Sequence, residues 1–299
     1  MAERTARANG IEVVYEELGD PDDPTMLLVM GLGVQMLGWD ERFCRMLAER
    51  GFRVVRFDNR DVGRSTKIEG GPRANVLAAA AGDFSSASYT LDAMADDCAG
   101  LLDYLGAASA HAVGASQGGM IAQALAIRHP ERVLSLASIM SNTGARWSGQ
   151  PSLRLYGSLL RRTPRNRGAF IDYIVRMYRA IGSPGFERDE EDLRRMAGLS
   201  FDRGHDPAGA ARQLMAVIAA TDRRRELGRV RVPTVVIHGT RDKLVAPSGG
   251  RATARAIPGA RLVRIKGQGH DLPRGAWPQI IDAIVENAAR AGEVEPAAA

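Results

Sequence analysis

Several residue types are scarce in this chain of 299 residues, and each scarcity narrows what the chain can be. There are only two cysteines, Cys44 and Cys98, which excludes a disulfide framework and a cysteine-rich metal site. Both fall in helical patterns, so we expect two buried free thiols rather than a disulfide bond. No apolar run reaches membrane-spanning length, and residues 1–10 lack the apolar stretch of a signal peptide. We therefore expect a cytoplasmic protein with no membrane partner.

Lysine and aromatic residues are scarce as well, because the chain has three lysines beside 37 arginines and is 5% aromatic. Residues 143–229 hold 17 arginines against 10 acidic residues, so the net charge of +5 originates in this segment. Arginine clusters at 161–167 and 223–225 raise the hypothesis of nucleic-acid binding. The scarcity of aromatics and the acids at 187–191 favour a solvated helical surface instead. We expect no nucleic-acid partner, and a preference for anionic substrates stays open.

The order of apolar patterns predicts an α/β fold. Asn9-Gly10 is a favoured hairpin turn, and the alternation in residues 11–18 predicts a strand after it. Short apolar runs separated by helical patterns then predict a mostly parallel, doubly wound sheet, which with the hairpin has eight strands. The later strands are expected near 27–30, 54–58, 111–114, 133–139, 234–238 and 261–265.

One long segment, between the strands expected near 133–139 and 234–238, contains helical patterns and no strand. We expect helices in it around 151–163, 168–182, 188–200 and 207–221. The chain is long enough for one core of roughly 200 to 250 residues and an inserted subdomain. The predicted organisation is a core of residues 1–142 and 230–299, with a helical cap, or lid, of residues 143–229 after the sixth strand.

The pentapeptide Gly114-Ala115-Ser116-Gln117-Gly118 lies between a predicted strand and a predicted helix. In a G-x-S-x-G pattern the serine occupies a tight strand-to-helix turn, and glycines two residues away remove side chains that would clash. The bare pattern is weak evidence, because a shuffled chain with this much glycine would show it roughly one time in five. Its context therefore decides whether Ser116 is a nucleophile.

Two further residues supply that context. Asp242 follows the strand predicted near 234–238, and His270 follows the one near 261–265, each after a glycine turn. The chain order Ser, Asp, His is the order of α/β-hydrolases rather than that of the two well-known protease families. His238 is expected to be a packed histidine, and Asp271 is a possible competitor for the imidazole. Ser116, Asp242 and His270 are thus the predicted catalytic residues.

With these motifs the chain resembles the α/β-hydrolase superfamily over nearly its whole length. Residues 26–33 resemble its strand and oxyanion loop, with Met30 in place of the usual His. Residues 54–65 resemble its Asp-x-Arg-Gly-x-Gly-x-Ser turn, with Asp61 where Gly is common. Met30-Gly31 followed by Leu37-Gly38-Trp39 is similar to the aclacinomycin methylesterase-like serine esterases.

The resemblance implies a serine hydrolase acting on a small-molecule carboxylic ester, without a cofactor or a metal ion, as a monomer or homodimer. The chemistry assigns attack to Ser116, general base and acid catalysis to His270, and orientation of the imidazole to Asp242. The oxyanion is expected to be bound by the backbone N–H groups of Leu32 and Gln117. Candidate substrate-binding residues are Gly31, Trp39 and Trp147.

Other chemistries remain open on the same serine triad. Carbon–carbon bond hydrolysis, lactone hydrolysis, acyl transfer and perhydrolysis are not separated from ester hydrolysis by these motifs. A ligand-binding receptor built on a hydrolase scaffold is a further alternative. The identity of the substrate depends on pocket contacts that the sequence does not show.

Overall fold

The computed structural model describes residues 2–75, 78–79, 81–155, 157 and 163–292. Its centre is an eight-stranded sheet with the strand order β1-β2-β4-β3-β5-β6-β7-β8. β2 pairs antiparallel with β1 and β4. The other strands, β4, β3, β5, β6, β7 and β8, run parallel to one another. The strands are β1 Arg4–Ala8, β2 Ile11–Leu18, β3 Thr25–Val29, β4 Arg53–Phe57, β5 Ala110–Ala115, β6 Val133–Ile139, β7 Thr234–Gly239 and β8 Arg261–Ile265.

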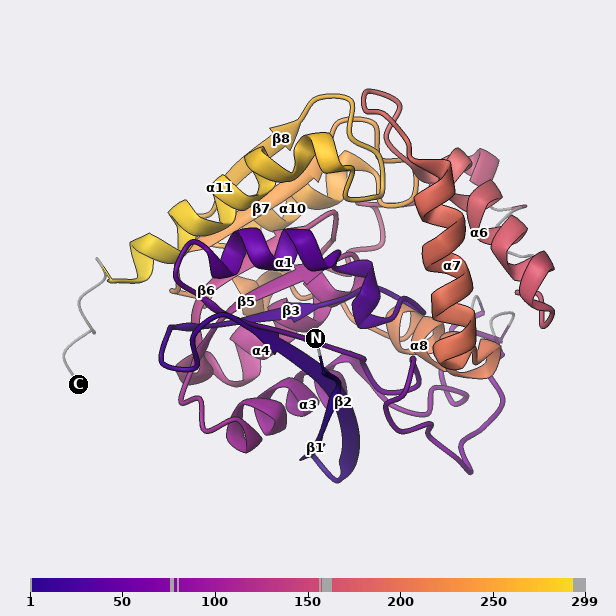
Figure 1. Ribbon diagram of the computed structural model, residues 1–299, viewed down its shortest axis with the longest axis horizontal. Coiled ribbons are helices and arrows are strands. Elements are labelled where there is room, and N and C mark those ends of the chain that lie inside the picture. Colours follow the sequence, from indigo (N-terminus) through magenta and orange to yellow (C-terminus); the bar gives the residue numbers. More distant parts are fainter. Residues whose placement is uncertain (1, 76–77, 80, 156, 158–162, 293–299) are drawn as a thin grey trace.

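Helices cover both faces of this sheet (Figure 1). α1 and α11 pack on one face in a cluster that includes Trp39 and Ile280, and α3 and α4 pack on the other with Leu101 and Ile121. α9 and α10 contact each other beside α4 and β7. The helices are α1 Glu41–Ala48, α3 Leu91–Tyr104, α4 Gln117–Arg128, α6 Arg167–Ile181, α7 Glu190–Gly204, α8 Pro207–Ile218, α9 Arg224–Leu227, α10 Pro247–Ala256 and α11 Trp277–Ala289, with short 3-10 turns at Met36–Gly38 (η1), Pro130–Arg132 (η2), Leu153–Leu155 (η3), Arg274–Ala276 (η4) and Arg290–Gly292 (η5).

The predicted α/β fold, with its eight-stranded, mostly parallel sheet, is confirmed. Asn9 and Gly10 both have positive φ, 47° and 77°, as the expected hairpin turn requires. Thr90 is the N-cap of α3, because its hydroxyl accepts the N–H of Ala93. Cys44 and Cys98 are buried free thiols in different core clusters. None of the helices in the described ranges is long and apolar enough to cross a bilayer.

The segment between β6 and β7, residues 140–233, contains α6, α7 and α8, which stand together at one end of the sheet (Figure 1). We call this segment the insertion. α7 continues to Gly204, past the expected end near 200, and the short α9 was not expected. The helical pattern predicted around 151–163 shows a 3-10 turn at Leu153–Leu155, and its residues 156 and 158–162 lie outside the described residues.

Candidate active site

Ser116 lies on a strained turn between β5 and α4. Its φ and ψ are 57° and −121°, in a region that side-chain-bearing residues rarely occupy. Its N–H donates to the carbonyl of Ile139 on β6 at 2.8 Å, which fixes the turn against the sheet. Such strain persists only where surrounding contacts enforce it, and here it points the hydroxyl away from the helix that follows.

Glycine is required on both sides of this turn by close backbone approach. A Cβ at Gly114 would lie 2.1 Å from the carbonyl oxygen of Gly118, and a Cβ at Gly118 would lie 2.0 Å from that of Val29. Both distances are shorter than any real Cβ contact, and both obstructing atoms belong to the backbone. The sequence pattern around Ser116 is therefore imposed by packing between β3, β5 and α4.

The three predicted catalytic residues lie in one hydrogen-bonded chain. His270 Nε2 is 2.9 Å from Ser116 Oγ, and His270 Nδ1 is 2.8 Å from Asp242 Oδ2. Asp242 and His270 are buried, and each sits just beyond the carboxyl end of its strand, β7 or β8. The hydroxyl, the imidazole and the carboxylate therefore have the mutual geometry of a nucleophile, a base and a group that orients the base.

Asp242 is fixed as an anion. Its Oδ1 accepts the backbone N–H groups of Leu244 and Val245, both at 2.9 Å, and its Oδ2 lies 3.4 Å from His238 Nε2. Burial alone would raise the pKa of this carboxyl, but His270 and His238 outweigh it and hold the pKa at about 2. Asp242 is thus ionised at neutral pH, and its Oδ2 accepts a hydrogen bond from the Nδ1–H of His270.

The two neighbouring candidates are occupied elsewhere. His238 is a packed, buried histidine whose Nε2 lies 2.9 Å from the carbonyl oxygen of Val245. Asp271 turns toward the insertion, where its carboxylate accepts the hydroxyl and the N–H of Ser183. Asp271 makes no hydrogen bond to His270, so of these two carboxylates Asp242 is the one hydrogen-bonded to the imidazole.

The predicted oxyanion loop lies against Ser116. A Cβ at Gly31 would be 3.1 Å from Ser116 Cβ and 3.6 Å from its Oγ. The backbone N–H of Leu32 follows directly, and that of Gln117 is the first of α4, where helix geometry provides no intrahelical acceptor. Among the described residues, none of the backbone hydrogen bonds of turns, loops and caps is donated by either N–H.

Sequence reasoning missed the side chains that hold this loop. Asn59 Nδ2 donates to the carbonyl of Met30 at 2.9 Å, and Asp58 Oδ1 accepts the N–H of Met36 at 2.8 Å. From the insertion, Gln213 Oε1 accepts the N–H of Gly33 at 2.7 Å. The family-like turn at 54–65 was a signal for the first two residues, but nothing in the local pattern marks a glutamine on a helix 180 residues away.

Asp61, the departure from the usual glycine, has a positive φ of 69° and is buried. Its carboxylate accepts the Tyr89 hydroxyl at 2.6 Å, the Arg212 Nε at 2.9 Å and the N–H of Ile68 at 2.8 Å. Asp tolerates the left-handed region better than most residues, because its short side chain hydrogen-bonds locally. Asp61 therefore replaces glycine at a turn and anchors α8 to the core.

The two tryptophans among the candidate substrate-binding residues differ in exposure. Trp39 is fully buried, packed 5.6 Å from the ring of Phe43 in the core under α1. Trp147 is 88% exposed, with Arg146 stacked over it at 5.4 Å. Burial removes Trp39 from contact with a ligand, and exposure places Trp147 at the outer surface. Of the three candidate substrate-binding residues, Gly31 alone is placed beside Ser116.

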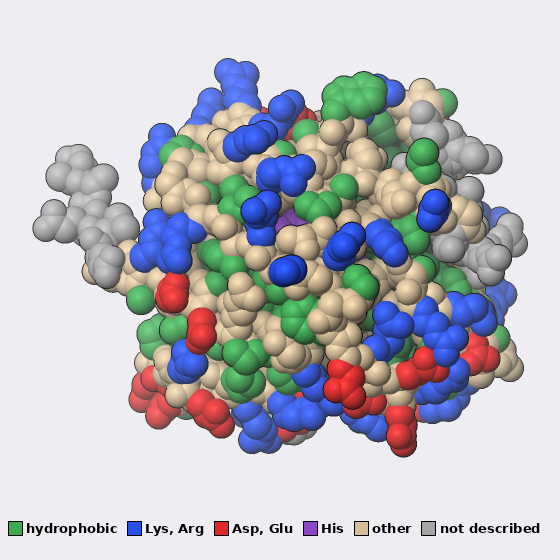
Figure 2. Space-filling view, turned by 90° about the horizontal axis from the view of Figure 1, so that it is seen from above, with side chains coloured by type: hydrophobic (Ala, Val, Ile, Leu, Met, Phe, Trp, Pro, Cys, Tyr) green, Lys and Arg blue, Asp and Glu red, His purple; other side chains and the backbone are tan. Residues whose placement is uncertain are grey.

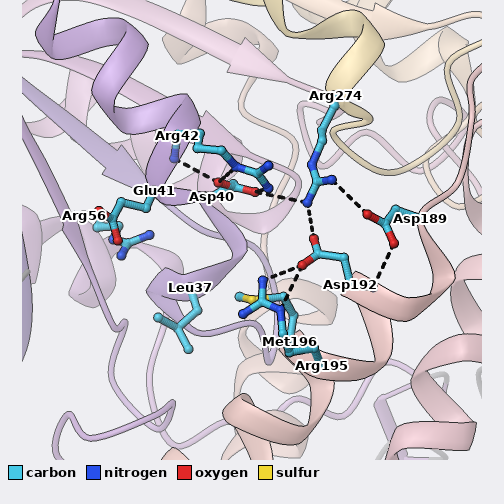
Figure 3. Close-up of a pocket in the computed structure, with 10 residues that line it drawn as sticks. All are labelled: Leu37, Asp40, Glu41, Arg42, Arg56, Asp189, Asp192, Arg195, Met196 and Arg274. Atoms are coloured by element: carbon cyan, nitrogen blue, oxygen red, sulfur yellow. Dashed lines mark hydrogen bonds and ion pairs between the residues drawn. The ribbon is translucent and has the colours of Figure 1, made fainter.

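A cavity of 530 Å³ opens where α7 meets the core, and Figure 3 shows its charged lining. Arg274 of the core is ion-paired with the start of α7. Its Nη1 lies 2.9 Å from Asp189, and its Nη2 contacts Asp192. Asp40 also pairs with Arg42 at 2.7 Å. The lining residues are Leu37, Asp40, Glu41, Arg42, Arg56, Asp189, Asp192, Arg195, Met196 and Arg274, so none of the three predicted catalytic residues borders this cavity.

Part of the basic charge of the insertion is ion-paired. Figure 2 shows Lys and Arg side chains spread over one face, with Asp and Glu side chains gathered along one edge of it. Exposed pairs in α6 and α7 include Arg167–Asp202, Arg179–Glu190 and Arg194–Asp172. This arrangement fits the expected solvated surface. Arg161 and Arg162 of the first cluster lie outside the described residues.

Comparisons with known proteins agree with this geometry. The chain is 28% identical over 303 residues to the rhodomycin D methylesterase DnrP of Streptomyces peucetius, covering 95% of this chain and 97% of that protein. It is 26% identical over 275 residues to the bifunctional esterase/perhydrolase DCH of Acinetobacter calcoaceticus, covering 89% and 91%. The expected resemblance to methylesterases is therefore confirmed.

Solved structures show the same architecture. The enol-lactonase from Burkholderia xenovorans LB400 is 25% identical, with a TM-score of 0.70 and coverage of 97% of this chain and 100% of that one. A thermophilic esterase from Thermogutta terrifontis has a TM-score of 0.74 at 24% identity, covering 97% and 99%. The model of the alpha/beta hydrolase fold family matches residues 24–273, from β3 to the segment after His270. The chain thus belongs to the alpha/beta hydrolase fold family.

Proposed function

We propose that the protein hydrolyses a carboxylic ester of a small to medium-sized organic molecule through an acyl-enzyme on Ser116. The observation that carries this proposal is the hydrogen-bonded chain from Ser116 through His270 to Asp242, with contacts of 2.9 and 2.8 Å. A serine hydroxyl is a weak nucleophile at neutral pH and needs an adjacent base, which His270 Nε2 supplies. Methylesterase and esterase relatives over most of the chain support ester cleavage as the reaction.

The proton follows the hydrogen-bonded chain in both half-reactions. His270 takes the Ser116 proton as the oxygen attacks the carbonyl carbon, and the Asp242 carboxylate stabilises the resulting imidazolium. His270 then returns the proton to the alcohol, which leaves as the ester bond breaks. Water, deprotonated by the same imidazole, releases the acid and restores Ser116.

The negative charge on the carbonyl oxygen requires donors aimed at it. We assign this role to the N–H groups of Leu32 and Gln117, because Gln117 directly follows Ser116 and Leu32 directly follows Gly31, which lies beside Ser116. Each such donor contributes about 2.7 to 4 kcal/mol to transition-state stabilisation in related chemistry.

We further propose that residues 143–229 form the cap over this site. α6, α7 and α8 stand at the end of the sheet where the parallel strands terminate (Figure 1), which is where ligands bind in such folds. The backbone N–H of His270 donates to the carbonyl of Ile181 at the end of α6, at 2.8 Å. This contact supports the proposal, because it joins the insertion to His270, the proposed base, and a cap at that position would select the substrate.

The test is steady-state hydrolysis of p-nitrophenyl butyrate by the wild type and by Ser116→Ala, purified in parallel. Wild-type turnover that disappears in the variant supports the proposal and leads to methyl esters, lactones and longer acyl chains as a substrate series. Equal activity of the two proteins would refute catalysis by Ser116. Tight ligand binding without turnover in the wild type would favour the receptor alternative instead.

A further inference from the structure

Gln213 on α8 is a completely buried glutamine whose two side-chain polar atoms both bond to the backbone of the core. Its Oε1 accepts the N–H of Gly33 at 2.7 Å, and its Nε2 donates to the carbonyl of Arg60 at 2.8 Å. Its own main-chain carbonyl accepts Nε2 of Gln117 at 3.1 Å. One residue of the insertion therefore contacts three separate segments of the core.

Each of these segments is connected to the oxyanion site. Gly33 follows Leu32 directly, and Gln117 carries the second N–H assigned to the oxyanion. Arg60 follows Asn59, which holds the carbonyl of Met30 at the start of the same loop. From the insertion, Gln213 thus bonds to Gly33, the neighbour of one donor, and to the side chain of Gln117, which carries the other.

We propose that Gln213 is a positioning residue that fixes the spacing of the two oxyanion donors, so that α8 contributes to the chemical step. This inference rests on the proposed function. A buried amide with both ends paired has one orientation, since turning it over would set donor against donor and acceptor against acceptor. Gly33 has a positive φ of 67°, and its N–H is held by Gln213, so this bond restrains the backbone directly after the Leu32 N–H.

The alternative is that Gln213 merely attaches α8 to the core, and the adjacent residue provides a matched control. Arg212 also ties α8 to the core, through Asp61, with Nε 2.9 Å from Oδ2. Neither Arg212 nor Asp61 is hydrogen-bonded to Gly33 or Gln117. Loss of attachment alone would therefore affect Arg212 and Gln213 variants alike, whereas loss of donor spacing would affect only those of Gln213.

The experiment compares the wild type with Gln213→Met, Gln213→Glu and Arg212→Met, using p-nitrophenyl butyrate for kcat and KM. Phenylboronic acid, which forms a tetrahedral adduct with a catalytic serine, reports the oxyanion site independently of turnover. Gln213→Met keeps the volume and removes both side-chain bonds, so we expect kcat to fall about 10- to 100-fold with KM within about threefold. Boronate affinity should fall by a similar factor. Gln213→Glu still accepts the N–H of Gly33, so its kcat and boronate affinity should lie between those of Gln213→Met and the wild type. Arg212→Met should retain kcat within about threefold.

Equal losses of kcat in Gln213→Met and Arg212→Met would overturn the proposal, as would a change confined to KM or unaltered boronate binding. If Gln213→Met does not fold, the comparison of Gln213→Glu with Arg212→Met decides by the same criteria. Ser116→Ala separates the two proposals. If it keeps full activity, the proposed function fails, whereas loss of activity in Ser116→Ala with normal kcat in Gln213→Met refutes only the role of Gln213.

Discussion

Asn59 donates a hydrogen bond of 2.9 Å to the carbonyl of Met30, and both residues are buried. Related enzymes are expected to have a histidine at position 30, whose side chain could brace the loop. Here the Met30 side chain packs in the core beside Trp39, and the brace comes from the following turn. Asn59 thus braces the loop through the backbone carbonyl of Met30, in place of a side-chain contact from position 30.

Replacing Asn59 should therefore damage both stability and catalysis. Asn59→Leu has a similar size but leaves a buried carbonyl without its partner, at a cost of about 1 to 3 kcal/mol. We expect kcat to fall roughly 10-fold, because the oxyanion loop loses its anchor at one end. Chemical denaturation and steady-state kinetics measure the two effects, and an unchanged kcat would separate Asn59 from the oxyanion loop.

Asp242→Asn should preserve the fold and remove most of the activity. An asparagine Oδ1 still accepts the N–H groups of Leu244 and Val245, but its amide toward His270 favours the wrong imidazole tautomer. We expect kcat to fall about 10⁴-fold, as it does in other triads. Circular dichroism provides the control for folding. A loss of less than tenfold would point to another carboxylate as the orienting group.

The strain at Ser116 predicts a difference between two inactive variants. Glycine adopts φ 57° and ψ −121° without a steric penalty, whereas alanine retains its Cβ in that region. We expect Ser116→Gly to be more stable than Ser116→Ala by about 1 kcal/mol, as measured by urea denaturation. Equal stabilities would mean that the turn is not strained in solution.

His111 should make the stability depend on pH. It is buried beside Ser135 at 2.9 Å, and burial lowers its pKa to about 4. Between pH 4 and 6.5 the unfolded chain binds a proton that the folded protein does not, so stability rises with pH in this window. The loss on acidification is on the order of 3 kcal/mol. His111→Asn should flatten the pH dependence of urea denaturation there, and an identical dependence would assign it to other groups.

Asp242 acts in a lower window with the same sign. Its folded pKa of about 2 lies below the usual value of 3.8, so its contribution to stability is present above pH 4 and is lost as the pH falls toward 2. Because His111 and Asp242 titrate in separate ranges, acid denaturation of Asp242→Asn should differ from that of the wild type mainly below pH 4. A difference centred near pH 6 would contradict this assignment.

The sequence predicted the features that depend on local patterns. The strands and the hairpin at Asn9-Gly10 follow from periodicity and turn chemistry, and the structure confirms them. Ser116, Asp242 and His270 could be selected because each follows a strand, and parallel strands bring their carboxyl ends to one edge of a sheet. Their catalytic roles, and the boundaries of the cap at 143 and 229, stay predictions.

The support around the site could not be predicted, since it depends on contacts between distant segments. Gln213 is one polar residue on a helix whose other buried positions, such as Met215 and Ala216, follow an ordinary apolar pattern. Ser183 removes Asp271 from competition through a contact that spans 88 residues. The placement of Trp39 depended in the same way on the packing of α1, which no short motif contains.

The bonds between the insertion and the core limit how this protein can be redesigned. Exchanging residues 140–233 for those of a relative with a different substrate would also remove Gln213 from Gly33, Ser183 from Asp271 and the Ile181 carbonyl from His270. A chimera of this kind would change specificity and weaken catalysis together. Grafts that keep Gln213, Ser183 and Ile181 and vary only the surfaces between them should change specificity without weakening catalysis.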